Sequence, residues 1–213
     1  MVGQAGLREC LLDPGVEAVL TVGRSATGVQ NAKLREIVHS DLLNYTAIES
    51  ELAGWDACFF CLGVSSGGMA PELYERLTYG IAVAAGQTLS RLNPGMTFVY
   101  VSGMGTDTSE QGRVRWARVK GRTENTLLRL FPAAYMFRPA VILATHGERS
   151  RTEAYRVAYN LTKPVLPLLR RLFPKYFITT EEIARAMLNV TRHGYPKRIL
   201  ESADIRDAGQ KRT

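Results

Sequence analysis

The chain has 213 residues, 46% of them hydrophobic and 22% charged, so it is long enough to bury a core and is expected to form one domain. No stretch approaches the roughly 20 apolar residues that span a bilayer, and the first residues lack the basic-then-apolar layout of a secretory signal, which indicates a cytoplasmic protein. The formal net charge of +7 suits an anionic partner (a nucleic acid, a membrane surface or a phosphorylated small molecule) and equally suits a solvated basic surface.

Strands and helices alternate over the first two thirds of the chain. In chain order, the sequence predicts a short helix over 7–12, strands over 18–22 and 34–38, a helical turn over 48–52, a strand over 57–62, a long helix over 71–92, a strand over 97–101, a helix over 114–130 and a strand over 134–137. This alternation is typical of a parallel sheet with helices on both faces.

The alternation weakens beyond Thr145. A proline-punctuated stretch over 164–174 is followed by Thr179 and Glu182, which have the spacing of a capping box for a helix through Val190. A last edge strand is expected over 197–201. We therefore predict a single domain over 1–213, of which about 145–213 is a C-terminal segment on the substrate side.

The three cysteines favour reduced thiols, because their number is odd and no secretion signal is present. Cys58 and Cys61 lie within an apolar run that reads as a strand, where side chains three residues apart point to opposite faces and do not bridge easily. We interpret both as core residues. The histidines lie far apart without a second ligand at metal-binding spacing, so no metal site is predicted; they are His39, His146 and His193.

Ligands of an open parallel sheet lie outside the carboxyl ends of its strands. Here those ends carry Arg24, Asp41, Gly63, Ser102 and Arg138-Pro139. Although far apart in sequence, these residues are expected to converge on one crevice.

This set of strand ends resembles the short-chain dehydrogenase/reductase superfamily, particularly its atypical branch of epimerase-like and Tat-interacting-protein-like NAD(P)-binding proteins. The resemblance extends to about Ile205 and rests on the order and spacing of the motifs together. It implies a Rossmann-like, doubly wound parallel sheet with a nicotinamide dinucleotide cofactor.

Three strand ends correspond to cofactor-binding positions of the family. Arg24 stands where NADP-preferring members place a cation on the 2′-phosphate, which makes NADP the expected cofactor and NAD the less expected one; a solvated arginine in a turn is the other interpretation. Asp41 corresponds to the residue that meets the adenine ring, or it caps the next helical turn. Gly63 corresponds to the glycine where the backbone passes close to the cofactor.

Two further positions carry the chemistry of the family. Ser102 matches the serine that hydrogen-bonds a substrate oxygen, and Lys120 matches the lysine that holds the nicotinamide ribose; a surface lysine on a basic helix is the alternative for Lys120. The family tyrosine four residues before that lysine is replaced by Trp116, whose indole cannot replace a phenol as proton donor to a carbonyl. Trp116 would then line the pocket or stack on the nicotinamide or the substrate.

Arg138-Pro139 resembles the pair that follows the sixth strand of this branch and shapes the loop under the nicotinamide. The start of the chain departs from the family, since Met1-Val2-Gly3-Gln4 matches only the end of the glycine fingerprint, with Gly3 as its last glycine. We therefore expect an N-terminally truncated Rossmann-like fold, which lacks the first strand either because the start is misassigned or because the protein has no such strand. In this form the chain is expected to bind dinucleotide poorly.

The segment from about 149 to 176 alternates leucines with arginines and prolines. We interpret it as a lid over the substrate; weak contact of 164–176 with an anionic membrane surface is the alternative. No nucleic-acid motif supports a nucleic-acid partner.

The resulting hypothesis is an NADP(H)-binding oxidoreductase or epimerase of an unknown small molecule. A non-catalytic NADP-binding sensor or interaction module is the competing one.

Overall fold

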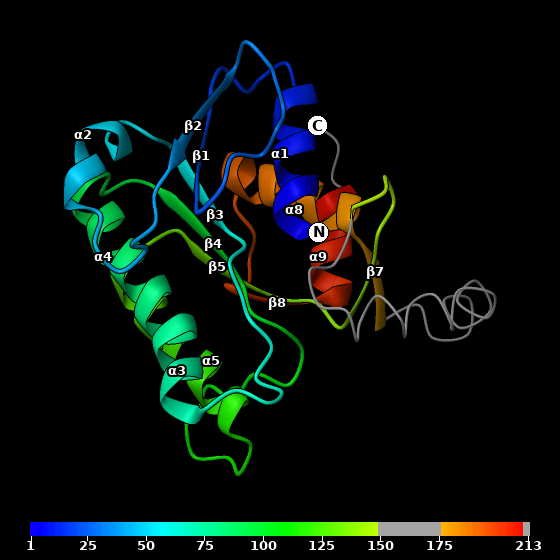
Figure 1. Ribbon diagram of the computed structural model, residues 1–213. Coiled ribbons are helices and arrows are strands. Elements are labelled where there is room, and N and C mark those ends of the chain that lie inside the picture. Colours follow the sequence, from blue (N-terminus) through cyan, green and yellow to red (C-terminus); the bar gives the residue numbers. More distant parts are fainter. Residues whose placement is uncertain (149–175, 211–213) are drawn as a thin grey trace.

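The computed structural model describes residues 1–148 and 176–210, and it is an α/β protein (Figure 1). Its strands are β1 (Val19–Gly23), β2 (Leu34–Val38), β3 (Ala57–Phe60), β4 (Thr97–Val101), β5 (Ala134–Arg138), β6 (Val141–Leu143), β7 (Phe177–Thr179) and β8 (Ile199–Glu201). Its helices are α1 (Val2–Leu12), α2 (Glu49–Leu52), α3 (Pro71–Glu75), α4 (Ile81–Leu92), α5 (Arg115–Leu130), α8 (Thr180–His193) and α9 (Ser202–Gln210), with a 3-10 turn at Thr46–Ile48 and a π turn at Arg76–Gly80.

Every strand pair among the described residues is parallel, as the alternating pattern predicts. The hydrogen-bonded ladders form three groups, with orders β1-β2, β3-β4-β5-β8 and β6-β7. β1 and β3 do not pair with each other. The sequence predicts a doubly wound parallel sheet without its first strand; the parallel α/β architecture is confirmed, and the truncation stays a prediction.

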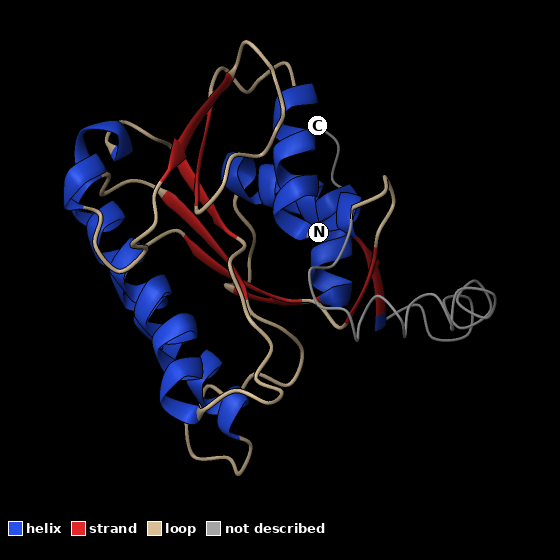
Figure 2. Ribbon diagram, viewed as in Figure 1, coloured by secondary structure: helices blue, strands red, loops and turns tan. Residues whose placement is uncertain are grey.

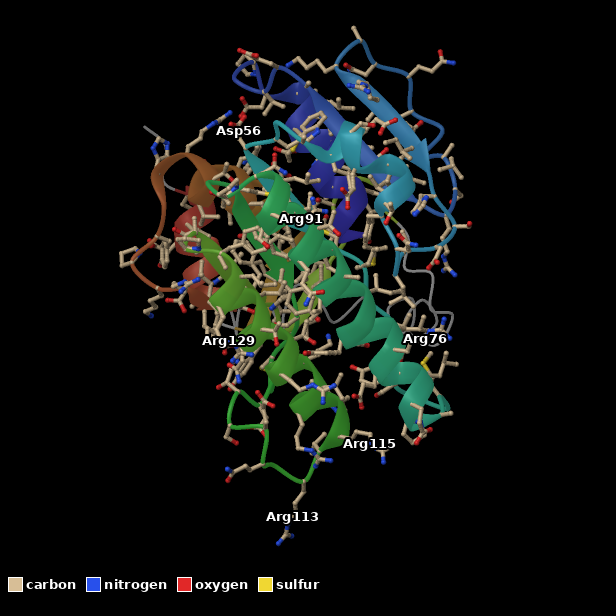
Figure 3. All side chains as sticks on the ribbon, turned by 90° about the vertical axis from the view of Figure 1, so that its left-hand side faces the viewer. Asp56, Arg76, Arg91, Arg113, Arg115 and Arg129 are labelled. Atoms are coloured by element: carbon tan, nitrogen blue, oxygen red, sulfur yellow. The ribbon has the colours of Figure 1, made fainter. Side chains whose placement is uncertain are left out.

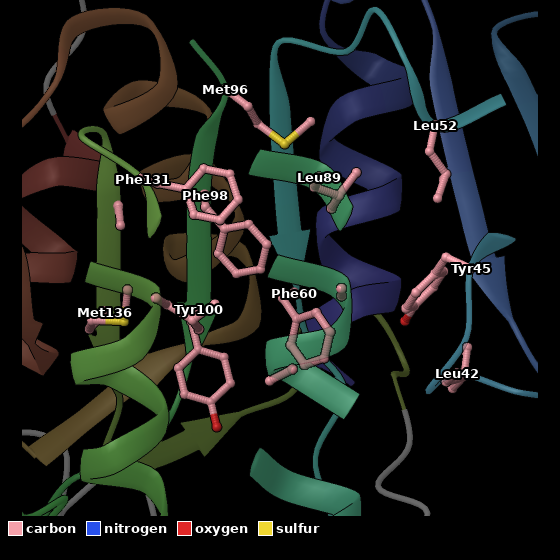
Figure 4. Packing of buried hydrophobic residues seen from close by; sticks show 14 of the residues in the cluster. Leu42, Tyr45, Leu52, Phe60, Leu89, Met96, Phe98, Tyr100, Phe131 and Met136 are labelled. Atoms are coloured by element: carbon pink, nitrogen blue, oxygen red, sulfur yellow. The ribbon is translucent and has the colours of Figure 1, made fainter. Parts of the chain in front are cut away.

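Helices cover both faces of the strands, which gives three layers (Figure 2). One face packs against α4 and α5, where Phe98 of β4 stacks on Phe131 with ring centroids 4.7 Å apart (Figure 4). The other face packs under α8 and α9 around Val99 and Ile178. Burying side chains of this size stabilises the fold by about 1.5–3 kcal/mol each, before the cost of ordering them.

Most expected elements are present, with shifted ends. Helix α1 begins at Val2, five residues earlier than predicted, because Ala5 and Gly6 are buried and this packing outweighs the low helix propensity of glycine. Strand β3 ends at Phe60, two residues before the expected end, and the long helix of 71–92 is interrupted by the π turn. The sequence pattern missed β6 and β7, since strands of three residues carry too little periodicity to recognise. It also missed the nine-residue helix α9.

The C-terminal part that is described follows its prediction. The Thr179 hydroxyl accepts the Glu182 N–H at 3.0 Å, and the Glu182 carboxylate accepts the Thr179 N–H at 2.7 Å, so the capping box is confirmed. The edge strand is also confirmed, because β8 pairs with β5. The stretch over 164–174 and almost all of the expected lid lie outside the described residues.

The cysteines are free thiols. Burial raises the pKa of Cys58 and of Cys61 to about 12, so both stay protonated at neutral pH. Among the described residues, no helix has the length and apolar character required to cross a membrane.

Candidate functional site

The carboxyl ends of β4 and β5 are held side by side. The Ser102 N–H donates to the Phe137 carbonyl at 2.8 Å, and the Met104 N–H donates to the Pro139 carbonyl at 3.1 Å. These two bonds extend the ladder past both strands, so the predicted residues Ser102, Arg138 and Pro139 lie together at one edge of the sheet.

Ser102 belongs to a buried polar network at this edge. Its hydroxyl oxygen lies 2.5 Å from Glu124 Oε1, to which it donates, and the Phe137 carbonyl is a second acceptor at 3.2 Å. Arg138 binds the same carboxylate with two donors, Nε at 3.0 Å from Oε1 and a terminal nitrogen at 2.5 Å from Oε2. Glu124 is completely buried, and Ser102 is 6% exposed. The hydroxyl of Ser102 is therefore committed to a structural ion pair in this arrangement.

Arg138 accordingly holds the network together. Burial lowers the pKa of its guanidinium, but the bonds and charge of Glu124 outweigh burial and leave that pKa raised. A second carboxylate, Glu201, lies 3.6 Å away and is half exposed. Sequence reasoning identified Arg138 and missed Glu124, which lies one helical turn after Lys120 on α5.

Lys120 lies at the same edge. Its ammonium donates to the Ser102 carbonyl at 2.5 Å, and it would lie 3.6 Å from a side chain added at Gly103. Burial lowers the pKa of Lys120, and the charge of Glu124 partly offsets that effect. The structure thus brings Lys120 to Ser102, as the sequence spacing predicts.

Trp116 lies one helical turn before Lys120 and borders a cavity of about 330 Å³. The cavity is lined by Ser66, Met69, Pro71, Tyr74, Arg115 and Trp116. Tyr74 brings a phenol into the lining, which sequence reasoning did not identify because Tyr74 lies on the distant helix α3. Burial raises the pKa of Tyr74, so its hydroxyl carries its proton at neutral pH.

The loop after Ser102 is fixed against α5. The Asp107 N–H donates to the Ala117 carbonyl at 3.0 Å. A side-chain carbon added at Gly121 would lie 1.7 Å from the Asp107 carbonyl oxygen, so only glycine permits this approach. The same loop brings Gly105 to the Trp116 ring, where an added side-chain carbon would lie 3.5 Å away.

The remaining predicted residues lie apart from this network. Arg24 is exposed directly after β1 and forms no ion pair with any described residue. The Asp41 carboxylate accepts the Leu43 N–H at 3.0 Å within a local turn. It does not cap the next helical turn, Thr46–Ile48, whose N-cap position is Tyr45. Nothing lies within 4 Å of a side-chain carbon added at Gly63. A carbon added at Gly3, at the start of α1, would lie 3.4 Å from the Cys61 side chain.

Figure 3 shows the helical face that carries Arg76, Arg91, Arg113, Arg115 and Arg129. Cations of the described C-terminal part are paired within the fold. Arg185 pairs with Glu181 at 2.5 Å, Arg192 with Asp13 at 2.6 Å and Lys197 with Asp204 at 2.6 Å. Arg206 pairs with Glu182 at 3.3 Å, and Arg198 donates to backbone carbonyls, including that of Phe131 at 2.6 Å. The remaining late cations fall within 149–175 and 211–213, outside the described residues.

No protein-family model and no curated protein sequence matches the chain. Solved structures do match it over nearly its whole length. WbmF of Bordetella bronchiseptica, crystallised with NAD⁺, covers 98% of this chain and 73% of its own at a TM-score of 0.65 and 16% identity. UDP-glucose 4-epimerase of Thermotoga maritima covers 97% and 77% at a TM-score of 0.62 and 14% identity.

A third match is UDP-N-acetylglucosamine 4-epimerase of Methanobrevibacter ruminantium, which covers 92% of this chain and 71% of its own at a TM-score of 0.64 and 14% identity. At such identities the likeness establishes the fold. The epimerase-like, Rossmann-type fold expected from the sequence is thus confirmed.

Proposed function

We propose that this protein binds NADP(H) at the carboxyl edge of β4 and β5 and acts as an oxidoreductase or epimerase on a small molecule. The observation that supports this most is the position of Lys120, whose partly buried ammonium lies against Ser102 beside the cavity bordered by Trp116. An amine at this edge can donate to ribose hydroxyls, and the cavity next to it can take a small substrate. The structural neighbours WbmF and the two UDP-sugar epimerases have this fold.

The choice of NADP over NAD rests on Arg24. Its exposed guanidinium follows Gly23 at the end of β1 and has no carboxylate partner among the described residues, so it is available for a 2′-phosphate. Asp41 and Gly63 would line the adenine and pyrophosphate parts of the same site, and Gly3, with the N-terminus of α1, would lie at the pyrophosphate.

Proton transfer needs a group other than Trp116. We infer that Tyr74 supplies it, because its phenol lines the cavity with Trp116 and is protonated at neutral pH. The Ser102 hydroxyl is less suited, since it already donates to Glu124.

The engagement of Ser102 and the presence of Trp116 favour a second candidate function, a non-catalytic NADP-binding sensor or interaction module. In that case Ser102, Glu124 and Arg138 only shape the edge of the sheet, and Lys120 only binds.

Three expectations remain proposals. The C-terminal part over about 145–213 serves the substrate side, the protein works in the cytoplasm without a nucleic-acid partner, and the chain lacks a first strand. The interrupted ladder between β1 and β3 supports the last of these.

The test is equilibrium binding of NADPH and NADH to the wild-type protein, Lys120→Ala and Arg24→Glu. NADPH should bind more tightly than NADH, Lys120→Ala should weaken both, and Arg24→Glu should weaken NADPH alone. Both affinities should be low, because only the last glycine of the fingerprint is present, and absence of any saturable binding by either nucleotide would refute the proposal.

Turnover against a panel of carbonyl compounds and UDP-sugars separates the two candidate functions. An enzyme that uses Tyr74 should lose most of its kcat in Tyr74→Phe while still binding NADPH. A protein that binds NADPH with no turnover on the whole panel is the sensor.

A further inference from the structure

The cavity beside Trp116 is bordered by one cation and by no described carboxylate. Its lining consists of Ser66, Met69, Pro71, Tyr74, Arg115 and Trp116. Pro71 is the first residue of α3, and Arg115 is the first residue of α5. Figure 3 shows Arg115 near the beginning of both helices. A guanidinium therefore borders this cavity, and none of the described lining residues balances its charge.

Arg115 differs in this respect from the other arginines of α5, which bond within the fold. Arg118 donates to a backbone carbonyl at 2.5 Å, and Arg129 donates to a hydroxyl at 3.2 Å. Arg122 pairs with the carboxylate of Glu75. Arg115 has no hydrogen bond or ion pair with any described residue, although it is the arginine of this helix that lines the cavity. Its donors are therefore available to a ligand.

The other polar groups of the lining are hydroxyls. The Ser66 hydroxyl has no partner among the described residues, and the Tyr74 side chain, 3% exposed, brings a phenol. The rest of the lining is apolar and comes from Met69, Pro71 and the indole of Trp116. A few placed polar groups on an apolar wall are typical of a small-molecule site.

The size of the cavity favours a short ligand. Its volume of about 330 Å³ lies at the lower end of the range of about 300–1,000 Å³ that is typical of small-molecule sites. The Trp116 ring lies against the loop after Ser102, where a carbon added at Gly105 would be 3.5 Å from the ring. The loop therefore limits movement of the indole away from the cavity.

We infer that this cavity binds a small oxo acid, which has a short apolar chain, a carbonyl group and one carboxylate. The inference rests on the proposed function, because it names the substrate class of the same site. Arg115 binds the carboxylate, since the planar fork of a guanidinium matches two carboxylate oxygens. The apolar chain lies against Met69 and Trp116, and the carbonyl oxygen faces the Tyr74 hydroxyl.

The charge of the lining favours a carboxylate over a phosphate. One guanidinium balances one negative charge, whereas a phosphate monoester carries close to two at neutral pH. Arg115 is the cation of the described lining, and the Lys120 ammonium already donates to the Ser102 carbonyl. A phosphate would thus keep an uncompensated charge in a largely apolar cavity, which costs free energy.

Emission of Trp116 reports on the cavity in a Trp55→Phe variant, in which it is the only tryptophan. The probes are 4-methyl-2-oxopentanoate and its neutral amide, 4-methyl-2-oxopentanamide. Each is titrated without nucleotide and again in the presence of NADPH. We expect a saturable change in emission with the acid, which should bind about tenfold or more tightly than the amide, because the bond to a charged group is the stronger one.

Matched substitutions in the same variant locate the carboxylate at Arg115. Arg115→Ala should weaken binding of the acid about tenfold or more and leave binding of the amide unchanged. Arg115→Lys keeps the charge without the fork and should retain part of the affinity. Arg113→Ala is the control, because it removes the same charge two residues earlier, outside the lining, and should change neither affinity. Both arginines are exposed, so the fold should tolerate these changes.

Equal affinities for the acid and the amide, or equal weakening by Arg113→Ala and Arg115→Ala, would overturn the inference. So would Arg115-dependent binding of dihydroxyacetone phosphate that is tighter than that of the acid, because the cavity would then be a phosphate site. Binding of NADPH is followed separately by nicotinamide fluorescence. Its absence would refute the proposed function, and the titrations without nucleotide would still decide whether the cavity binds the oxo acid.

Discussion

Removing the Glu124 carboxylate should destabilise the protein strongly. Glu124 is fully buried, and the Arg138 side chain is 11% exposed. Glu124→Ala takes away the acceptor of two arginine donors and of the Ser102 hydroxyl. It leaves a largely buried guanidinium with only the half-exposed Glu201 nearby. Breaking a buried pair in this way costs about 3–5 kcal/mol of unfolding free energy.

Urea unfolding followed by tryptophan emission measures this loss. The matched control is Glu49→Ala, which removes the partner of Arg91 in a pair with 31% and 58% exposed side chains. Exposed pairs of this kind contribute less than about 1 kcal/mol. We therefore expect a large fall in the urea midpoint for Glu124→Ala and a small one for Glu49→Ala, with unchanged slopes.

The double variant Glu124→Leu with Arg138→Leu distinguishes a stranded charge from lost packing. Replacing both partners by apolar residues removes the unpaired charge, so the double variant should be more stable than Glu124→Ala. A Glu124→Ala variant that loses less than about 1 kcal/mol would refute the interpretation of this network as a structural ion pair.

Three further predictions concern the loop, the cap and the acid range. Gly121→Ala should lower the midpoint of thermal unfolding severely, because the new carbon would lie 1.7 Å from the Asp107 carbonyl oxygen. Gly95→Ala is the control and should change the midpoint little, because nothing lies within 4 Å of its new carbon. Thr179→Ala should cost about 1 kcal/mol in urea unfolding by removing the cap of α8, and Thr179→Ser should retain most of it; equal losses would contradict the capping role. The pKa of Asp13 is lowered, chiefly by its hydrogen bond with Arg192. The stabilisation by this pair is therefore complete above the unfolded pKa near 4 and is lost as the pH falls through the folded pKa. The unfolding free energy of Arg192→Ala should depend less on pH below about 4 than that of the wild type, and an equal dependence would contradict the role of this pair.

The sequence predicted the parallel α/β architecture because its strands are apolar runs closed by glycine or proline. It also predicted the grouping of Ser102, Lys120 and Arg138, since strand ends of a parallel sheet meet at one edge. Spacing along α5 was sufficient to place Trp116 and Lys120 on the same face.

The contacts within the site were beyond the sequence. Glu124 reads as an ordinary helical glutamate, and only the packing of α5 on β4 and β5 shows that it is buried and binds Arg138. Tyr74 was missed because its helix reaches the cavity through tertiary folding, with no local signal. Helix α1 was predicted too short because burial of Gly6 overrides a propensity that disfavours helix.

The most direct test of the cofactor site uses Trp116 itself. In a Trp55→Phe variant, Trp116 is the only tryptophan, and NADPH bound at the edge with Ser102 and Lys120 should quench its emission and gain sensitised nicotinamide fluorescence. The same titration of Trp116→Phe should quench Trp55 less, because Trp55 precedes the amino end of β3 and the proposed site is at the carboxyl edge of the strands. NADPH binding that leaves Trp116 emission unaltered, or that alters Trp55 instead, would contradict the proposed site.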